Sequence, residues 1–159
     1  MPDRDERPEA GEDADGGDVS VELVSAPSAA DAAGLSRLLP QLSSAPPPDH
    51  SVLVRIASAS ATALLLARAR GEVVGALTLV VVEIPTGVRA IIEDVVVDEA
   101  WRGRGVGSAL VERALAQAHT AGARSVDLTS RPSRVAANRL YERMGFTRRE
   151  TNVWRHDLR

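Results

Sequence analysis

The chain of 159 residues contains no cysteine and no lysine. Without cysteine it can form no disulfide, no thiolate metal site and no covalent acyl-cysteine intermediate. Without lysine it cannot contain the G-x-x-x-x-G-K-S/T loop of P-loop nucleotide-binding proteins. All 19 basic residues are therefore arginines. Nucleic-acid sites normally combine lysines and aromatic residues with arginine, so we predict no nucleic-acid partner.

Aromatic residues and long apolar runs are also scarce. Aromatic residues make up only 3% of the chain, within a hydrophobic content of 44%, so Val, Leu, Ile and Ala must fill the core. No apolar run approaches the roughly 20 residues of a membrane span, and the chain begins with acidic residues rather than a secretory signal. His50, His119 and His156 share no metal-ligand spacing. We therefore expect a cytoplasmic protein with no membrane partner and no metal.

The charge is concentrated at the N-terminus. Residues 1–18 hold eight acidic residues against two arginines, a net charge of −6, whereas the whole chain carries −3. This stretch is also rich in Pro and Gly and nearly lacks apolar residues, so it is predicted to be a disordered acidic tail ahead of one domain at residues 19–159. It is either a docking segment or a solubilising one, and its role stays open.

The most informative motif is the run R-G-R-G-V-G at residues 102–107. It lies between a predicted strand ending at Val97 and a predicted helix beginning at residue 105. Glycines leave backbone N–H groups accessible, a helix start adds partial positive charge, and arginine forks match phosphate oxygens. This spacing predicts a pyrophosphate cradle.

A dinucleotide-binding loop is the nearest alternative for this motif. Asp127 lies at the distance expected of the acidic residue that binds the ribose. However, Ser108 stands where the third glycine of G-x-G-x-x-G belongs, and five residues separate the strand from Gly103. The spacing therefore disfavours a dinucleotide.

Two motifs together resemble those of the GNAT family of N-acetyltransferases. Arg102, Gly105 and Gly107 occupy the defined positions of R/Q-x-x-G-x-G/A, which resembles that family's acetyl-CoA loop. About 30 residues later, the run A-N-R-L-Y-E-R-M-G-F at 137–146 looks like the second signature, N-x-x-L/F-Y-x-x-x-G-F. The likeness covers roughly residues 70–150 and implies an acetyl-CoA cosubstrate.

The order of predicted elements agrees with that resemblance. The patterns predict helices at 29–42, 49–59, 105–121 and 131–145, and strands at 19–24, 63–70, 73–83, 88–97 and 124–130, with a final hairpin at 146–156. The implied fold class is α/β (α+β), the acyl-CoA N-acyltransferase fold. Its mixed central sheet would have about six to seven strands, flanked by about four helices.

The resemblance also implies which residues bind the cofactor. The strand before the loop would hold the pantetheine arm through its backbone, and one N–H there would polarise the thioester carbonyl. Asn138 would hydrogen-bond the same arm, with helix capping as the alternative. The implied set is Val95, Val96, Val97, Arg102, Gly103, Arg104, Gly105, Val106, Gly107, Ser108 and Asn138.

The catalytic candidates follow from the protons that must move. An alkyl amine has a pKa near about 10.4 and must lose a proton before it attacks. Glu93 or Asp94 would accept it, directly or through a chain of waters; neighbouring strand residues point to opposite faces, and the resemblance favours Glu93. Tyr141, the single tyrosine, stands at the family's general-acid position, although a packing role is the alternative.

The implied function is transfer of an acetyl group from acetyl-CoA to a primary amine. Because cysteine is absent, we expect direct attack in a ternary complex. The alternative is a catalytically silent acyl-CoA-binding module of the same fold. Arg131 and Trp154 are candidates for the edge of the acceptor pocket. The amine acceptor stays unidentified, and a homodimer agrees with the resemblance because dimers are common among relatives.

Overall fold

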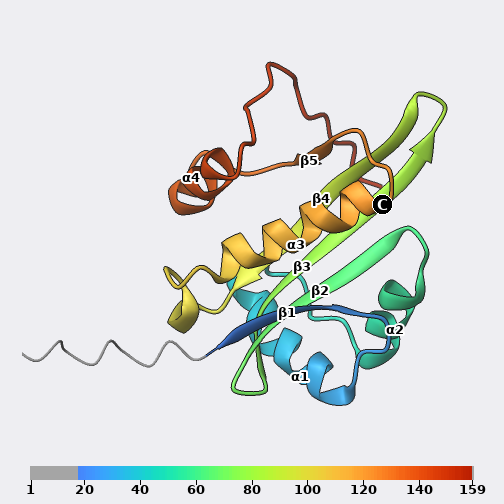
Figure 1. The fold of residues 1–159 in the computed structure, drawn as a ribbon. Coiled ribbons are helices and arrows are strands. Elements are labelled where there is room, and N and C mark those ends of the chain that lie inside the picture. Colours follow the sequence, from blue (N-terminus) through green and yellow to red (C-terminus); the bar gives the residue numbers. More distant parts are fainter. Residues whose placement is uncertain (1–17, 159) are drawn as a thin grey trace, which may run out of the picture.

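The computed structural model describes residues 18–158 and contains one five-stranded sheet with the order β1-β2-β3-β4-β5 (Figure 1). The first four strands pair antiparallel, and β5 lies parallel to β4. Their bounds are β1 Val19–Val24, β2 Thr62–Ala69, β3 Glu72–Ile84, β4 Gly87–Val97 and β5 Val126–Leu128.

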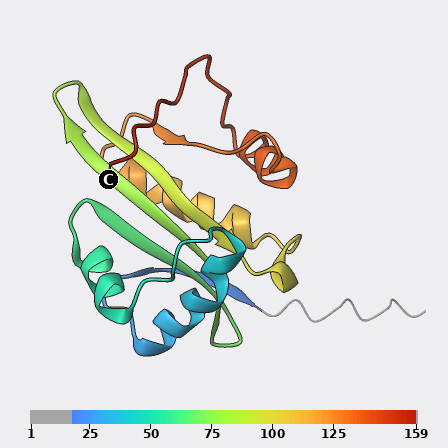
Figure 2. The same ribbon diagram turned by 180° about the vertical axis from the view of Figure 1, so that it is seen from behind.

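Helices cover both faces of this sheet. α1 (Ala29–Leu38) and α2 (His50–Ser58) lie on one face, α3 (Val106–Thr120) crosses the other, and α4 (Val135–Arg143) follows β5 (Figures 1 and 2). Two short 3-10 helices complete the set, η1 (Leu39–Gln41) after α1 and η2 (Glu99–Trp101) after β4. In the part of the chain that is described, no helix has the length and apolarity needed to cross a membrane.

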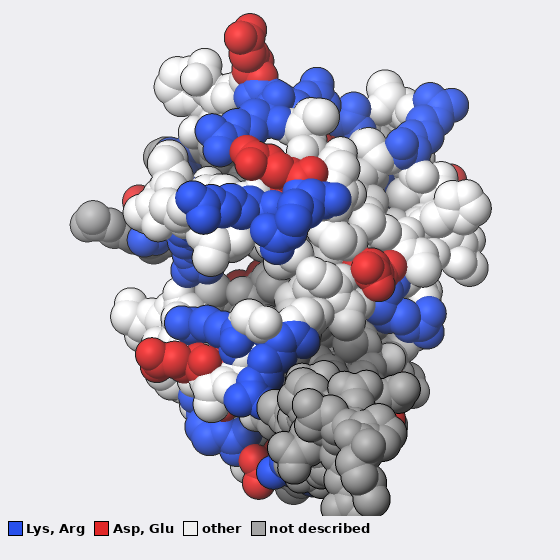
Figure 3. All heavy atoms as spheres, turned by 60° about the vertical axis from the view of Figure 1, so that its left-hand side comes forward, with Lys and Arg blue, Asp and Glu red and all other residues white. Residues whose placement is uncertain are grey.

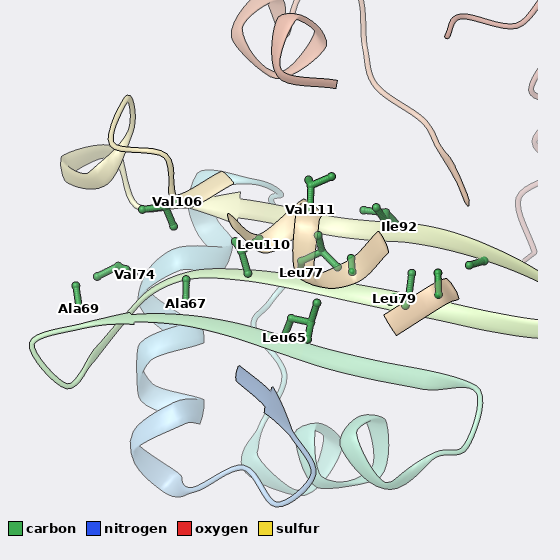
Figure 4. Packing of buried hydrophobic residues seen from close by; sticks show 13 residues of the cluster. Leu65, Ala67, Ala69, Val74, Leu77, Leu79, Ile92, Val106, Leu110 and Val111 are labelled. Atoms are coloured by element: carbon green, nitrogen blue, oxygen red, sulfur yellow. The ribbon is translucent and has the colours of Figure 1, made fainter. Parts of the chain in front are cut away.

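Two apolar layers hold the helices on the sheet. On the α3 face, Leu65 and Leu77 of the sheet pack with Leu110 and Val111 of α3 (Figure 4). On the opposite face, α1 and α2 contribute a second cluster that includes Leu35, Leu38, Leu53, Leu64 and Leu66. Leucine, valine, isoleucine and alanine build both layers, as the scarcity of aromatic residues predicts.

The helix starts follow local capping rules. The Ser28 hydroxyl accepts the Asp31 N–H at 3.2 Å while the Asp31 carboxylate accepts the Ser28 N–H at 2.8 Å, which is a complete capping box for α1. Asp49 caps α2 by accepting the Val52 N–H at 2.9 Å. The helix predicted at 29–42 instead ends at Leu38, because Pro40 has no N–H to continue it and a 3-10 turn follows.

The expectation for the C-terminal segment was wrong. The hairpin predicted at 146–156 is not formed, so the described sheet has five strands rather than six or seven. The physical reason is that this stretch lacks the alternation of a strand: Arg148, Arg149 and Glu150 are consecutive charges, and the apolar pair Val153 and Trp154 is adjacent. The predicted tail at 1–18 lies, apart from Asp18, outside the described residues.

Strand β4 contains a bulge. Val96 pairs with Ala76 but Glu93 pairs with Thr78, so β4 has one extra residue between these pairs. Asp94 adopts φ 51° at this point, in the left-handed region. The expectation that Glu93 and Asp94 point to opposite faces rests on simple alternation, and the bulge interrupts that alternation.

Candidate functional site

The site begins where β4 and β5 separate. Their parallel pairing ends at Ile92 and Leu128, but β4 continues to Val97. The Asp98 N–H donates back to the Val74 carbonyl of β3 at 2.9 Å, so the alternation of the strand directs the peptide groups of Val97 away from β3. Val97, at the end of β4, therefore presents its backbone groups to the open side of the sheet.

The glycine loop lies beside this open strand end. Gly103 and Gly105 have φ values of 75° and 81°, which side chains disfavour, and no atom lies within 4 Å of the position a Cβ would take at either. Gly105 starts α3 without any side-chain cap, unlike α1 and α2. The first N–H groups of α3 therefore point out of an uncovered helix start, a geometry suited to an anion.

Gly107 serves a different purpose from the two glycines before it. A Cβ here would lie 3.1 Å from Cδ2 of Leu140 on α4 and 3.8 Å from Val97. The missing side chain thus lets α4 pack closely on the first turn of α3. The sequence pattern predicts that Gly107 lines the pyrophosphate site. In the structure, the space that a side chain would occupy at Gly107 is next to Leu140 and Val97.

The two loop arginines are held in different ways. The Arg102 guanidinium donates to the Val97 carbonyl at 3.2 Å and to Gln41 Oε1 at 3.4 Å, and the same oxygen accepts the Glu99 N–H at 3.0 Å. Arg104 lies over the Trp101 ring, 5.1 Å from its centroid. Arg102 therefore holds the loop in place through hydrogen bonds, whereas the Arg104 guanidinium is held by stacking on the Trp101 ring.

Arginine side chains flank a hollow on this side of the molecule (Figure 3). Below it are the loop and the start of α3, and above it is α4 with the segment that leads into it (Figures 1 and 3). The arginines on these elements are Arg102, Arg104, Arg131, Arg134, Arg139 and Arg143. Such a set attracts a polyanion, because its charges add over the surface of a cleft.

Tyr141 is placed by the end of its helix. Gly145 has φ 87°, the Phe146 N–H donates to the Tyr141 carbonyl at 3.0 Å, and the Gly145 N–H donates to Glu142 at 3.1 Å. This is a Schellman motif, which requires the left-handed residue that glycine supplies. It turns Phe146 back against Tyr141, with the rings edge-to-face at 5.9 Å. The G-F pair of the motif thus fixes the tyrosine ring.

Burial raises the pKa of Tyr141 above its ordinary value near 10, although the positive charge of Arg134 acts in the opposite direction. Its hydroxyl has no hydrogen-bond partner among residues 18–158, so it can donate to a ligand. Tyr141 lines a cleft of about 1310 Å³ between β5, α4 and the C-terminal segment. The Ser130 hydroxyl, buried and without a partner in the same described residues, comes from the wall of this cleft.

Asn138 lies in the first turn of α4, and its side chain contacts the turn before the helix. Its Nδ2 donates to the Arg131 carbonyl at 3.0 Å and approaches the Pro132 carbonyl at 3.5 Å, which holds the turn before α4. Its side-chain oxygen remains available to a ligand.

The remaining candidates are dispersed. Glu93 and Asp94 are exposed, next to each other at the bulge where β4 leaves β5. Arg131 is exposed in the segment before α4, and Trp154 is 89% exposed and does not line the cleft. Among the described residues, no three His, Asp or Glu side chains come together as a metal site.

Sequence reasoning missed three contacts that shape the site. Gln41 holds the loop, the Leu42 carbonyl accepts Arg134 Nη2 at 3.2 Å, and Asp98 lies 3.9 Å from Arg37. These partners are separated by 61 or more residues, and no local pattern distinguishes a bracing glutamine from a surface one.

Comparison with known proteins gives a consistent result. A family model described as Acetyltransferase (GNAT) family matches residues 34–146. A Trypanosoma brucei acetyltransferase structure is 28% identical with a TM-score of 0.73, covering 89% of this chain and 100% of that one. A putative acetyltransferase from Agrobacterium tumefaciens is 26% identical with a TM-score of 0.75, covering 87% and 99%.

An aminoglycoside acetyltransferase from an uncultured soil metagenomic sample is 21% identical with a TM-score of 0.78, covering 89% of this chain and 97% of that one, and shows the shared fold. No curated protein matches the sequence. With both signatures, the splayed β4 and β5, and a family match over more than two thirds of its length, the chain belongs to the GNAT family of acetyltransferases.

Proposed function

We propose that the protein transfers an acetyl group from acetyl-CoA to a primary amine, which attacks directly within a ternary complex. The observation that carries this proposal is the separation of β4 from β5 after Ile92, immediately beside the uncapped start of α3. A strand end whose backbone is not paired with β5 suits the amide-rich pantetheine arm, and the helix start suits the pyrophosphate.

The residues present fit acetyl-CoA on chemical grounds. Positions 103 and 105 have open space where a side chain would stand, and Arg104 brings a guanidinium to the same loop. Val95, Val96 and Val97 would hold the pantetheine arm through backbone groups. When bound, acetyl-CoA supplies the thioester whose carbonyl carbon an amine can attack.

Three proton-handling side chains complete the proposed mechanism. Glu93 or Asp94 accepts a proton from the incoming ammonium group, directly or through water, so that a neutral amine attacks. Tyr141 donates its phenol proton to the departing thiolate. Because burial raises the pKa of Tyr141, it stays protonated through the neutral range and beyond. No cysteine exists to carry the acetyl group, which supports direct transfer.

The exposed acids favour a cationic acceptor. Glu93 and Asp94 place two negative charges at the end of the proposed cofactor strand, which attracts an ammonium group to the position from which it must attack. An aminoglycoside, a small polyamine and a protein N-terminus all present such a group.

A thiol-release assay with acetyl-CoA and a panel of amines tests the proposal. We expect release that depends on one amine class, with a fall of about 100-fold or more in kcat for Tyr141→Phe and for either Glu93→Gln or Asp94→Asn. Calorimetry with acetyl-CoA alone tests the binding step separately. Failure to bind acetyl-CoA would overturn the proposal, whereas binding without turnover on any amine would favour the silent acyl-CoA-binding module.

A further inference from the structure

Helix α4, which carries Tyr141, has a limited attachment to the rest of the fold. None of its nine residues is buried, and the strand that leads to it, β5, is only three residues long. Leu140 rests on the first turn of α3, and the Phe146 ring packs on Tyr141. Tyr141 and Met144 also pack against the α3-face cluster, so a few partly buried side chains hold α4 in position.

One of these contacts joins the two sides of the β4 and β5 separation. Arg134, the residue just before α4, donates from Nη2 to the Leu42 carbonyl at 3.2 Å, across 92 residues of sequence. Leu42 directly follows η1, whose Gln41 accepts the Glu99 N–H and Arg102 at the end of β4. The η1 segment is thus connected to the cofactor loop on one side and to α4 on the other.

Arg134 also acts on Tyr141 through its charge. It lies two helical turns before the tyrosine, and its guanidinium partly offsets the effect of burial on the pKa of the phenol. When Tyr141 gives up its proton, the O–H bond breaks and a phenolate remains until water reprotonates it. The positive charge of Arg134 stabilises that phenolate.

We infer that Arg134 is a positioning residue of the reaction: its hydrogen bond to the Leu42 carbonyl ties α4, and with it Tyr141, to the η1 segment that holds the cofactor loop. The role of Arg134 in the reaction rests on the proposed function, whereas its attachment of α4 to the η1 segment does not. Arg139 offers a matched control for the general charge of the arginine set, because it belongs to the same set and the same helix but makes no hydrogen bond or ion pair with the described residues.

The first measurement uses Tyr141 as the single tyrosine of the chain. Its ionisation can be followed directly by ultraviolet absorbance, with circular dichroism marking the pH at which the protein unfolds. Arg134→Gln should raise the pKa of Tyr141, because the stabilising charge is lost. Arg134→Lys should raise it less, and Arg139→Gln should leave it unchanged. A titration of Arg134→Gln that coincides with the wild type would overturn the inference.

The second measurement is kinetic. Arg134→Gln should lower kcat about tenfold with a smaller change in the KM for acetyl-CoA, and Arg134→Lys should recover part of the loss. Amide hydrogen exchange at residues 135–143 should also become faster in Arg134→Gln and not in Arg139→Gln. If the wild type releases no thiol with any amine, the proposed function fails while titration and exchange still decide the role of Arg134. Equal kcat in the two glutamine variants would count against it.

Discussion

At the residue scale, Gly105 has a left-handed backbone conformation that favours glycine, and it lies at the exposed helix start where we propose that an anion binds. Gly122, at the far end of α3, has nearly the same φ, 78° against 81°, and equally open surroundings. Substitution by alanine therefore imposes the same backbone strain at both positions, about 1 kcal/mol. Only one of the two positions faces the proposed cradle.

Gly105→Ala and Gly122→Ala should accordingly lose similar stability in a urea titration. We expect only Gly105→Ala to lose affinity for acetyl-CoA, by about tenfold or more, because its methyl group stands where the pyrophosphate would approach. Calorimetry on both variants gives the comparison. Equal affinity in the two proteins would place the cofactor elsewhere.

The backbone conformation of Asp94 and the charge of its carboxylate can be tested by separate substitutions. It occupies the left-handed conformation at the bulge, which Asp and Asn tolerate and β-branched residues do not. Asp94→Asn should keep the stability of the wild type, so any loss of kcat in it reports the carboxylate alone. Asp94→Val should cost about 1–2 kcal/mol of unfolding free energy, measured by chemical denaturation. Wild-type stability in Asp94→Val would show that the bulge relaxes.

At the element scale, α1 is fastened to the sheet by a buried charge. Asp31 is 4% exposed, caps its own helix and accepts Arg68 Nη2 of β2 at 2.7 Å, while Arg68 also pairs with Glu22 of β1. Burial acts to raise the pKa of Asp31, but hydrogen bonds from Ser28 and Arg68 outweigh it, so the pKa is lowered overall. The ionised carboxylate is therefore the form that stabilises the fold.

The sign of the pH dependence follows. A lowered folded-state pKa gives stabilisation above the unfolded value of 3.8, which is lost as the pH falls through the lower folded value. Asp31→Asn should cost about 2 kcal/mol near pH 7, and the gap to the wild type should shrink below pH 4. Thermal melts from pH 7 to pH 3 measure it. A gap that does not change with pH would contradict the assignment.

Elements with strong local signals could be predicted from sequence, and long-range ones could not. The caps Ser28 and Asp49 and the glycine at 145 each act within a few residues, so the starts of α1 and α2 and the end of α4 were expected near their observed places. The bulge at Asp94 depends on pairing with β3, a partner that lies outside any local window. The glycines of the loop form a local pattern and could be predicted. The hydrogen bond from Arg102 to Gln41 joins distant parts of the chain and could not.

At the scale of the whole molecule, the fold divides into a well-packed body and a lightly attached end. The body consists of the sheet from β1 to β4 with α1, α2 and α3, and it contains the residues of both apolar clusters that are most deeply buried. After β5, residues 147–158 are all exposed, including the apolar Val153, Trp154 and Leu158. Stability should therefore come almost entirely from the body.

Removal of residues 148–159 should leave the melting temperature nearly unchanged, within about 2 °C. The Arg148–Glu142 ion pair that is lost is exposed, and exposed pairs contribute little. Differential scanning calorimetry measures this. A truncation that also removes Phe146 should destabilise the end of α4, because the Schellman hydrogen bond and the ring contact with Tyr141 disappear. A large loss from the shorter truncation would mean that the C-terminal segment packs against the body.

The stacking of Arg104 on Trp101 gives the protein a built-in optical reporter. The chain has only two tryptophans, and the other, Trp154, lies on the exposed C-terminal segment. A Trp154→Phe protein would therefore emit from a single indole beside the glycine loop. Any anion that draws the Arg104 guanidinium from the ring changes that emission, so ligand arrival could be followed in stopped flow without an added dye and without knowing the acetyl acceptor.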